Sequence, residues 1–484
     1  MRQNTSLTRE DNSLAEDGYN TNMNAHRGAI KNTNSQQQLP MKSATTQIIS
    51  PTWIAPVIPL GALLLDHSLV IEGARIIALL PKTDALVRFP DAPHLKLEGH
   101  LVTPGFINAH GHAAMTLLRG IADDREMMDW LTNWIWPIEG QLVSEQFVYD
   151  GTRLAAMEMI MGGTTCAADT YFFPEAASRA LTQMHFRAQV GMPVLQFANA
   201  WARNEEDHIH KGLAFRDSIK NSSLVTTAFA PHSPYSVSDG GFNKIQLYSE
   251  QLDLAVHLHL HETATEVTDS LRDNGLRPIA RMNNLGILSP SLQAIHMTQL
   301  RNDEIELLAI NGAQVAHCPE SNMKLASGFC PVEKLRASNI NVAIGTDGAA
   351  SNNDLDMIQE ARSASLLSKA TTGDATSLDA QTCLEMMTIN GARFLGLEDQ
   401  IGSLEPGKLA DITAIDLSHP SFQPIYNPIS QLVYIASARD VSDVWIGGKR
   451  VLNNRQLPEA DTESILAATR QWQKKISAVN SKQV

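Results

Sequence analysis

The sequence predicts an α/β fold: a (β/α)8 barrel of the TIM type with a small β-sandwich built from the N- and C-terminal flanking segments. Three observations support this fold class. Eight short apolar runs alternate with helix-length segments, β-rich runs lie on both sides of them, and polar side chains recur where the eight runs end. With 484 residues, of which 43% are hydrophobic, the chain can bury a core of this size.

The two ends of the chain differ in composition from its middle. Residues 1–45 are rich in Asn, Gln, Ser and Thr, and we expect a disordered extension because they bury too little apolar surface to offset the ordering entropy. Residues 46–103, with runs such as LVIEGARIIALLP, and residues 402–455, with GSLEPGKLADITAIDL, are predicted to form the two parts of one β-sandwich. Residues 456–484 are expected to be a helical tail. The sequence leaves open whether Met41 is the natural start.

Residues 104–401 are predicted to form the barrel, because strand-like runs and helical stretches alternate there in eight βα units. Helical stretches such as SEQFVYDGTRLAAMEMIMGG and RNDEIELLAING lie between the runs. In barrels of this kind the active site lies at the carboxyl ends of the strands. The eight runs are, in order, GFINAHGH, GGTTCAADT, FRAQVGMPVL, LVTTAFAP, AVHLHLHE, LQAIHM, AQVAHCPE and NVAIGTDG.

Side chains that bind metals or transfer protons follow several of these runs, which brings them to one end of the barrel. His110 and His112 end the first run, and side chains two residues apart in a strand point the same way. One histidine at a strand end is usually a hydrogen-bonded packing residue, but a coincidence at several strand ends indicates a site. The others are His232 after the fourth run, His259 and Glu262 in the fifth, His296 in the sixth and Asp347 in the eighth.

Part of this set has the composition of a metal site. It supplies three imidazoles and one carboxylate, which suit Zn²⁺ and would also serve Fe²⁺, with a coordination position left for water. We therefore expect one divalent metal ion, with zinc favoured over iron. The expected ligands are His110, His112, His259 and Asp347.

The fifth run, VHLHLHE, leaves the third imidazole ambiguous. Period two places His257, His259 and His261 on one face of the strand. His257 is deeper and is expected to fill the barrel interior, whereas His261 is expected beyond the strand, behind the ligands or at the mouth. The choice of His259 rests partly on a family resemblance.

Eight segments carry this resemblance: PGFINAHGHAAMTLLRG, WIWPIEG, APHSPYSVS, HLHLHETATEV, IHM, HCPESNMKL, GTDGAASNNDLDM and GSLEPGKLADI. With them the chain resembles the amidohydrolase superfamily and, within it, the 5-methylthioadenosine/S-adenosylhomocysteine deaminases, over residues 48–455. The HxH and TDG elements are specific for the fold and less specific for the substrate.

The resemblance also implies a role for each matching residue. Carried over, it makes His110, His112, His259 and Asp347 the metal ligands, Glu262 a contact to the purine, Glu139 the residue that binds ribose hydroxyls, His232 a further substrate contact, and His296 the histidine beside the attacking water. For the mechanism we expect Asp347 to take a proton from that water, Glu262 to donate one to the ring, and Asp347 and His296 to return one to the departing amine. For two residues a purely structural role stays open at this point: Glu139 as a solvated helix residue and His232 as a residue that braces a turn.

The implied activity is the hydrolytic deamination of an adenine nucleoside to an inosine-type product and ammonia. The sequence does not rank 5′-methylthioadenosine, S-adenosylhomocysteine, adenosine and 5′-deoxyadenosine. One metal is favoured because LVTTAFAPHSPY lacks the lysine that binuclear amidohydrolases use at the fourth strand. The alternatives are a hydrolase of guanine or an s-triazine on the same scaffold, and a catalytically inactive barrel scaffold.

The bulk properties favour a small-molecule substrate. A formal net charge of −14 argues against nucleic acid and anionic membranes as partners, since both are usually met by basic surfaces. The four cysteines have no CxxC spacing and are expected to be reduced thiols, which favours the cytoplasm. A homo-oligomer is left open.

Overall fold

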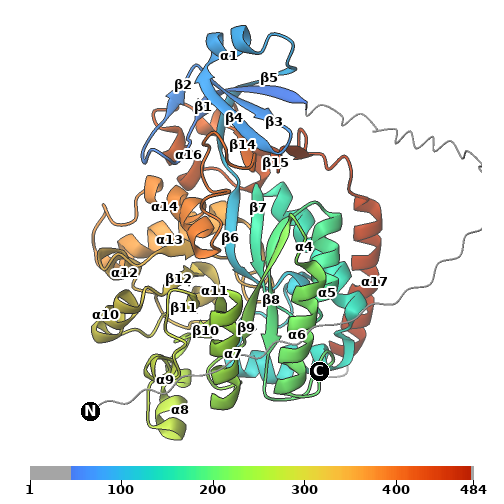
Figure 1. Cartoon of the computed structure of the whole chain (residues 1–484), viewed down its shortest axis with the longest axis vertical. Coiled ribbons are helices and arrows are strands. Elements are labelled where there is room, and N and C mark those ends of the chain that lie inside the picture. The colour runs from blue at the N-terminus through green and yellow to red at the C-terminus, as the bar shows by residue number, and fades with distance from the viewer. Residues whose placement is uncertain (1–44, 481–484) are drawn as a thin grey trace, which may run out of the picture. The chain divides into compact units, whose positions relative to one another are not determined.

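The computed structural model describes residues 45–480, so the predicted disorder of residues 1–44 lies outside the described residues. The predicted barrel is confirmed: eight parallel strands follow one another around it in the order β6 to β13 (Figure 1). Each strand lies inside the corresponding apolar run. The strands are β6 (Phe106–Gly111), β7 (Thr164–Asp169), β8 (Arg187–Val194), β9 (Val225–Pro231), β10 (Val256–Leu260), β11 (Leu292–His296), β12 (Gln314–His317) and β13 (Val342–Ile344).

The first and last strands meet without a regular ladder. The backbone N–H of Asp347 donates to the carbonyl oxygen of His110 at 3.0 Å, and that of Thr346 donates to the side-chain oxygen of Asn108 at 3.0 Å. A Cβ on Gly345 would lie 2.6 Å from the backbone nitrogen of His110, so only glycine allows this approach. The contact fixes Asp347 beside the first strand.

Helices follow the strands and surround the barrel (Figure 1). Their ends carry the expected caps: the Ser144 hydroxyl accepts a hydrogen bond from the backbone N–H of Phe147 at the start of α4, and Gly312 adopts the left-handed conformation after α10. The helices are α4 (Glu145–Met161), α5 (Pro174–Gln183), α6 (Glu205–Ile219), α7 (Asp239–Leu252), α8 (Ala264–Asn274), α9 (Pro278–Asn284), α10 (Asn302–Asn311), α11 (Pro319–Lys324), α12 (Val332–Ala337), α13 (Met357–Thr372), α14 (Ala380–Met386) and α15 (Ile389–Phe394).

A longer insertion joins β6 to α4. It consists of the 3₁₀ turn η1 (Ala113–Leu118), α2 (Met127–Trp130), the π-helical turn η2 (Leu131–Ile135) and α3 (Trp136–Leu142). Because it follows the first strand, it lies at the end of the barrel where the predicted site residues are found.

The flanking segments form one mixed sheet, in the order β16-β15-β14-β5-β1-β3-β4, with β2 paired to β1. The sheet bends back on itself: the backbone N–H of Ile76 in β4 donates to the carbonyl of Lys408, close to β14, at 2.9 Å, and one apolar cluster takes in Ile76, Ile412 and Trp445. The strands are β1 (Thr46–Ile54), β2 (Leu64–Leu65), β3 (His67–Glu72), β4 (Arg75–Pro81), β5 (His94–Pro104), β14 (Ile412–Asp416), β15 (Val441–Ile446) and β16 (Lys449–Leu452), and α1 (Lys82–Arg88) follows β4.

A buried ion pair joins this sheet to the barrel. Arg187 in β8 donates to both carboxylate oxygens of Asp411, at 2.8 and 3.1 Å, and both side chains are almost fully buried. The remaining elements are the 3₁₀ turns η3 (Pro420–Phe422) and η4 (Ala438–Asp440), α16 (Pro428–Tyr434) and α17 (Thr462–Asn480). Helix α17 packs on α4, where the indole of Trp472 donates to Asp150 at 2.9 Å. Among residues 45–480, no helix combines the length and the apolar composition needed to cross a membrane.

Candidate active site

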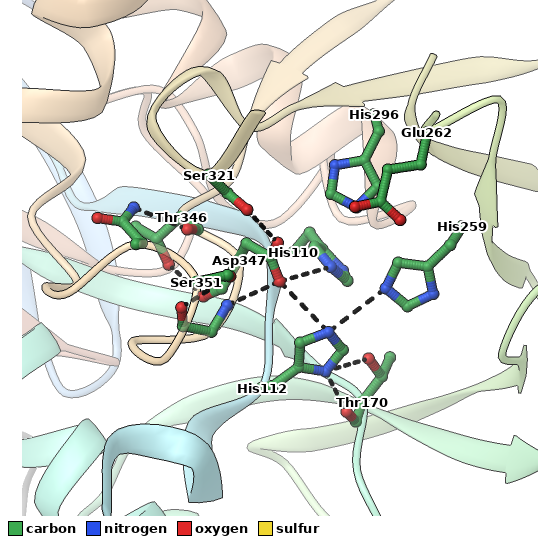
Figure 2. Close-up of polar contacts among 12 residues, drawn as sticks. His110, His112, Thr170, His259, Glu262, His296, Ser321, Thr346, Asp347 and Ser351 are labelled. Atoms are coloured by element: carbon green, nitrogen blue, oxygen red, sulfur yellow. Dashed lines mark hydrogen bonds and ion pairs between the residues drawn. The ribbon is translucent and has the colours of Figure 1, made fainter. Parts of the chain in front are cut away.

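The four expected ligands lie together at the carboxyl ends of the barrel strands, although three different strands supply them (Figure 2). Nε2 of His112 lies 3.3 Å from Nε2 of His259 and 3.3 Å from Oδ1 of Asp347. Nε2 of His110 lies 3.4 Å from the same carboxylate oxygen. Two groups of three side chains could hold a cation, because their ligand atoms lie within 4.8 Å of one another: His110, His112 and Asp347, and His110, His259 and His296.

Hydrogen bonds fix the proton on two of these imidazoles. Nδ1 of His112 lies 2.6 Å from the carbonyl oxygen of Thr170, and Nδ1 of His259 lies 2.6 Å from that of His232. A carbonyl oxygen only accepts, so each Nδ1 must donate, and each Nε2 keeps its lone pair. Nε2 of His110 is buried and has no hydrogen-bond partner within residues 45–480. Lone pairs gathered beside a carboxylate are what a divalent cation requires, so the residues fit a metal ion.

The electrostatics keep this set in its metal-binding protonation state. Burial lowers the pKa of His110 and of His259 well below the ordinary histidine value, so both rings are neutral at pH 7. Burial alone would raise the pKa of Asp347, but the adjacent side chains of His110, His112 and His296 hold it well below its usual range. The carboxylate also accepts from the Ser321 hydroxyl at 2.6 Å and from the backbone N–H of Gly348 at 2.7 Å.

Glu262 and His296 lie beside this cluster, and their side chains face each other (Figure 2). Oε1 of Glu262 is 3.8 Å from Nε2 of His296, and the Glu262 side chain is only 14% exposed. Burial raises the pKa of Glu262, while the charge of His296 opposes the shift. Glu266 holds the Glu262 backbone, because its carboxylate accepts from the N–H groups of His261, at 3.0 Å, and Glu262, at 2.7 Å.

Glu139 is not a freely solvated helix residue. It lies in α3, partly buried, and its carboxylate accepts a hydrogen bond from the Tyr171 hydroxyl. Burial raises the pKa of Glu139 to about 7, although the Tyr171 hydrogen bond opposes the shift. His232 directly follows β9 with its ring 5.0 Å from that of His259, and its carbonyl orients that ring. The His232 backbone thus contacts an expected ligand, while its own side chain is exposed.

The structure adds residues to which the sequence analysis gave no role. Ser321 holds Asp347, and Oδ1 of Asn322 accepts from Nδ1 of His296 at 2.9 Å; both come from α11, after the seventh strand. Their signal in the sequence was the pair of polar residues directly after HCPE. His257 is inside the barrel, as expected, and also contacts a ligand, since its Nε2 lies 2.8 Å from Nδ1 of His110. His261 instead accepts from the backbone N–H of Ile279 at 3.1 Å.

The chain is similar to known proteins over most of its length. Residues 101–451 match the amidohydrolase family. A protein of Teredinibacter turnerae named 5-methylthioadenosine/S-adenosylhomocysteine deaminase is 46% identical over 430 residues, which cover 89% of this chain and 97% of that protein. A protein of the same name from Saccharophagus degradans is 46% identical over 437 residues, covering 90% and 98%.

Solved structures give the same result. The crystal structure of an adenosine deaminase from Xanthomonas campestris with bound zinc superposes with a TM-score of 0.88 at 46% identity, covering 90% of this chain and 99% of that one. Guanine deaminase from C. acetobutylicum, at 20% identity and a TM-score of 0.76 over 84% and 100% of the two chains, shares the fold. Because the family match spans most of the chain and is joined by relatives of this similarity, the chain belongs to the amidohydrolase family.

Proposed function

We propose that this protein is a metal-dependent deaminase that converts an adenine nucleoside, 5′-methylthioadenosine or S-adenosylhomocysteine, to the inosine-type product and ammonia. The observation that carries the proposal is the proximity of three imidazole Nε2 atoms and Asp347, with Glu262 and His296 beside them. The substrate is taken from the names of the relatives at 46% identity, and an adenosine deaminase at the same identity supports the adenine ring.

The proposed metal is a single zinc ion held by His110, His112, His259 and Asp347. The zinc in the Xanthomonas campestris structure supports its identity, and a β9 strand without lysine supports a single ion. Such an ion supplies Lewis acidity, which lowers the pKa of a coordinated water from about 15.7 toward about 7 and so makes a nucleophile available at neutral pH.

In this mechanism Asp347 accepts a proton from the water whose oxygen adds to C6 of the adenine. Glu262 gives a proton to N1 as the ring loses its aromaticity, and the burial that raises its pKa supports this role. Nε2 of His296 faces the same space and orients the water.

Breakdown of the adduct returns both groups to their starting states. Asp347 passes its proton to the 6-amino group, which leaves as ammonia. Glu262 recovers a proton from the new C6 hydroxyl, so the product carries a carbonyl at C6 and hydrogen on N1. The overall reaction therefore consumes water and the aminopurine and yields ammonia and the oxopurine.

We assign the sugar to Glu139 and a further contact to His232. A carboxylate accepts hydrogen bonds from two neighbouring hydroxyls, and the Tyr171 hydroxyl fixes its position. An enzyme acting on a free base has no use for this group. Glu139 thus favours a nucleoside over guanine or an s-triazine as substrate.

The test is ammonia release by the purified protein across a panel of adenine nucleosides, with guanine and an s-triazine alongside, and elemental analysis of the same preparation. Glu262→Gln should keep its metal and lose about 10²- to 10⁴-fold in turnover, because the general acid is gone. The matched control is Glu306→Gln, the same change on an exposed helix residue, which should leave turnover unchanged. Metal-loaded protein that releases no ammonia from any adenine nucleoside, or a fully active Glu262→Gln, would overturn the proposal.

A further inference from the structure

We propose that His257 and Gln293 are positioning residues for the metal site: together they fix the proton on Nδ1 of His110 and so present the Nε2 lone pair of that ring to the ion. The inference rests on the metal site proposed above. His110 needs such a device because, unlike His112 and His259, it has no backbone carbonyl bonded to its Nδ1 within residues 45–480.

The three side chains form a continuous hydrogen-bonded chain inside the barrel. Nδ1 of His110 lies 2.8 Å from Nε2 of His257, and Nδ1 of His257 lies 3.0 Å from Oε1 of Gln293. His257 and Gln293 are register partners in the neighbouring strands β10 and β11, so they share the inner face. Each of the three residues is at most 2% exposed.

The direction of every bond follows from the far end of this chain. The Gln293 side chain bonds to the carbonyl oxygen of Phe394, which only accepts, so the amide NH₂ must point there and Oε1 must face His257. Oε1 in turn accepts, so Nδ1 of His257 donates. In a histidine ring that carries one proton, the nitrogen opposite the donating Nδ1 is an acceptor, so Nε2 of His257 accepts from His110. The proton on His110 therefore lies on Nδ1.

Gln293 is also accessible to small molecules from the end of the barrel opposite the candidate active site. It lines, with Phe394, Gln189 and Gln314, a pocket of about 560 Å³ near the amino ends of the barrel strands. A shortened side chain at position 293 would leave a space that connects with this pocket. A small amide can then take the place of the missing one.

The experiment measures the zinc dissociation constant by competition with a chromophoric chelator. His257→Leu and Gln293→Met remove one link each and should weaken zinc binding about 10- to 100-fold, the usual effect of losing the partner of a ligating histidine. His257→Gln keeps an acceptor for His110 and a donor for Gln293, so it should recover most of the affinity. His317→Leu is the matched control. His317 is as buried as His257 and lies in β12, two strands from β10, and its Nδ1 has no hydrogen-bond partner among the described residues. Loss of this ring should leave zinc affinity unchanged.

Chemical rescue separates this role from packing. For Gln293→Ala, acetamide should restore zinc affinity, because it accepts from His257 and donates to the Phe394 carbonyl. N,N-dimethylacetamide has no N–H and should not restore it. Wild-type affinity in both His257→Leu and Gln293→Met, an equal loss in His317→Leu, or equal rescue by the two amides would overturn the inference. Wild-type protein that binds no zinc would overturn the proposed function as well, so the two failures are distinguishable.

Discussion

Replacing Asn322 by leucine tests whether helix α11, which follows the seventh strand, contributes to catalysis. Asn322 and His296 are each 1% exposed, and Oδ1 of Asn322 accepts the Nδ1 proton of His296 at 2.9 Å. Leucine has a similar volume but no acceptor, so a buried N–H loses its partner. That loss costs about 1–3 kcal/mol. If the whole cost falls on the reactive orientation of the imidazole, it corresponds to about a 5- to 150-fold fall in kcat, at about 1.36 kcal/mol per factor of ten.

The assay is steady-state deamination of an adenine nucleoside by Asn322→Leu, with the zinc content of each preparation measured. We expect kcat to fall and zinc content to stay the same, because within residues 45–480 the Asn322 side chain bonds to His296 and to no expected metal ligand. Asn322→Asp keeps the acceptor and should recover most of the rate. A fully loaded Asn322→Leu with wild-type kcat would refute the reasoning, since the orientation of His296 would then not depend on this bond.

Three further outcomes follow from the structure. Removing the metal with a chelator should abolish activity and lower the melting temperature, and zinc at about 100 times its Kd should restore about 2.7 kcal/mol of stability, measured by thermal denaturation. Asp411→Asn should lower the free energy of unfolding by about 3–5 kcal/mol in denaturant titrations, because it leaves the Arg187 guanidinium buried beside a neutral group. The pKa of Glu139 is raised to about 7, so the hydroxyl-accepting carboxylate is populated as the pH rises through 7. The KM for nucleosides should therefore fall between pH 6 and 8, and Glu139→Gln should flatten that profile; a KM profile of the wild type that is already flat would contradict the assignment.

The barrel was predictable because its strands are buried on both faces and therefore stand out as continuous apolar runs. β6 and β7, for example, are buried at every position, and they lie inside GFINAHGH and GGTTCAADT. The grouping of His110, His112 and Asp347 was also predictable, since all follow from one rule about where parallel strands end. This rule predicts that the three side chains lie at the same end of the barrel, without any knowledge of the distances between them.

The individual hydrogen bonds were not predictable. The bond from Tyr171 to Glu139 joins a loop to an inserted helix 32 residues away in the chain, and the bond from His296 to Asn322 joins the end of β11 to helix α11. Strand periodicity states which face a side chain occupies, but it contains no information about which atom of a neighbouring strand it meets. Which nitrogen of a histidine donates depends on that atom.

The run VHLHLHE shows where the periodicity itself ends. Period two holds only while the backbone is extended, and β10 ends at Leu260. His261 then has φ = +54°, in the left-handed region, so its ring turns away from the face that His257 and His259 share and bonds to the N–H of Ile279. The same turn brings the Glu262 N–H to the Glu266 carboxylate, at 2.7 Å. The direction of Glu262 is thus set by a residue four positions later, through a backbone conformation that alternation along a strand does not describe.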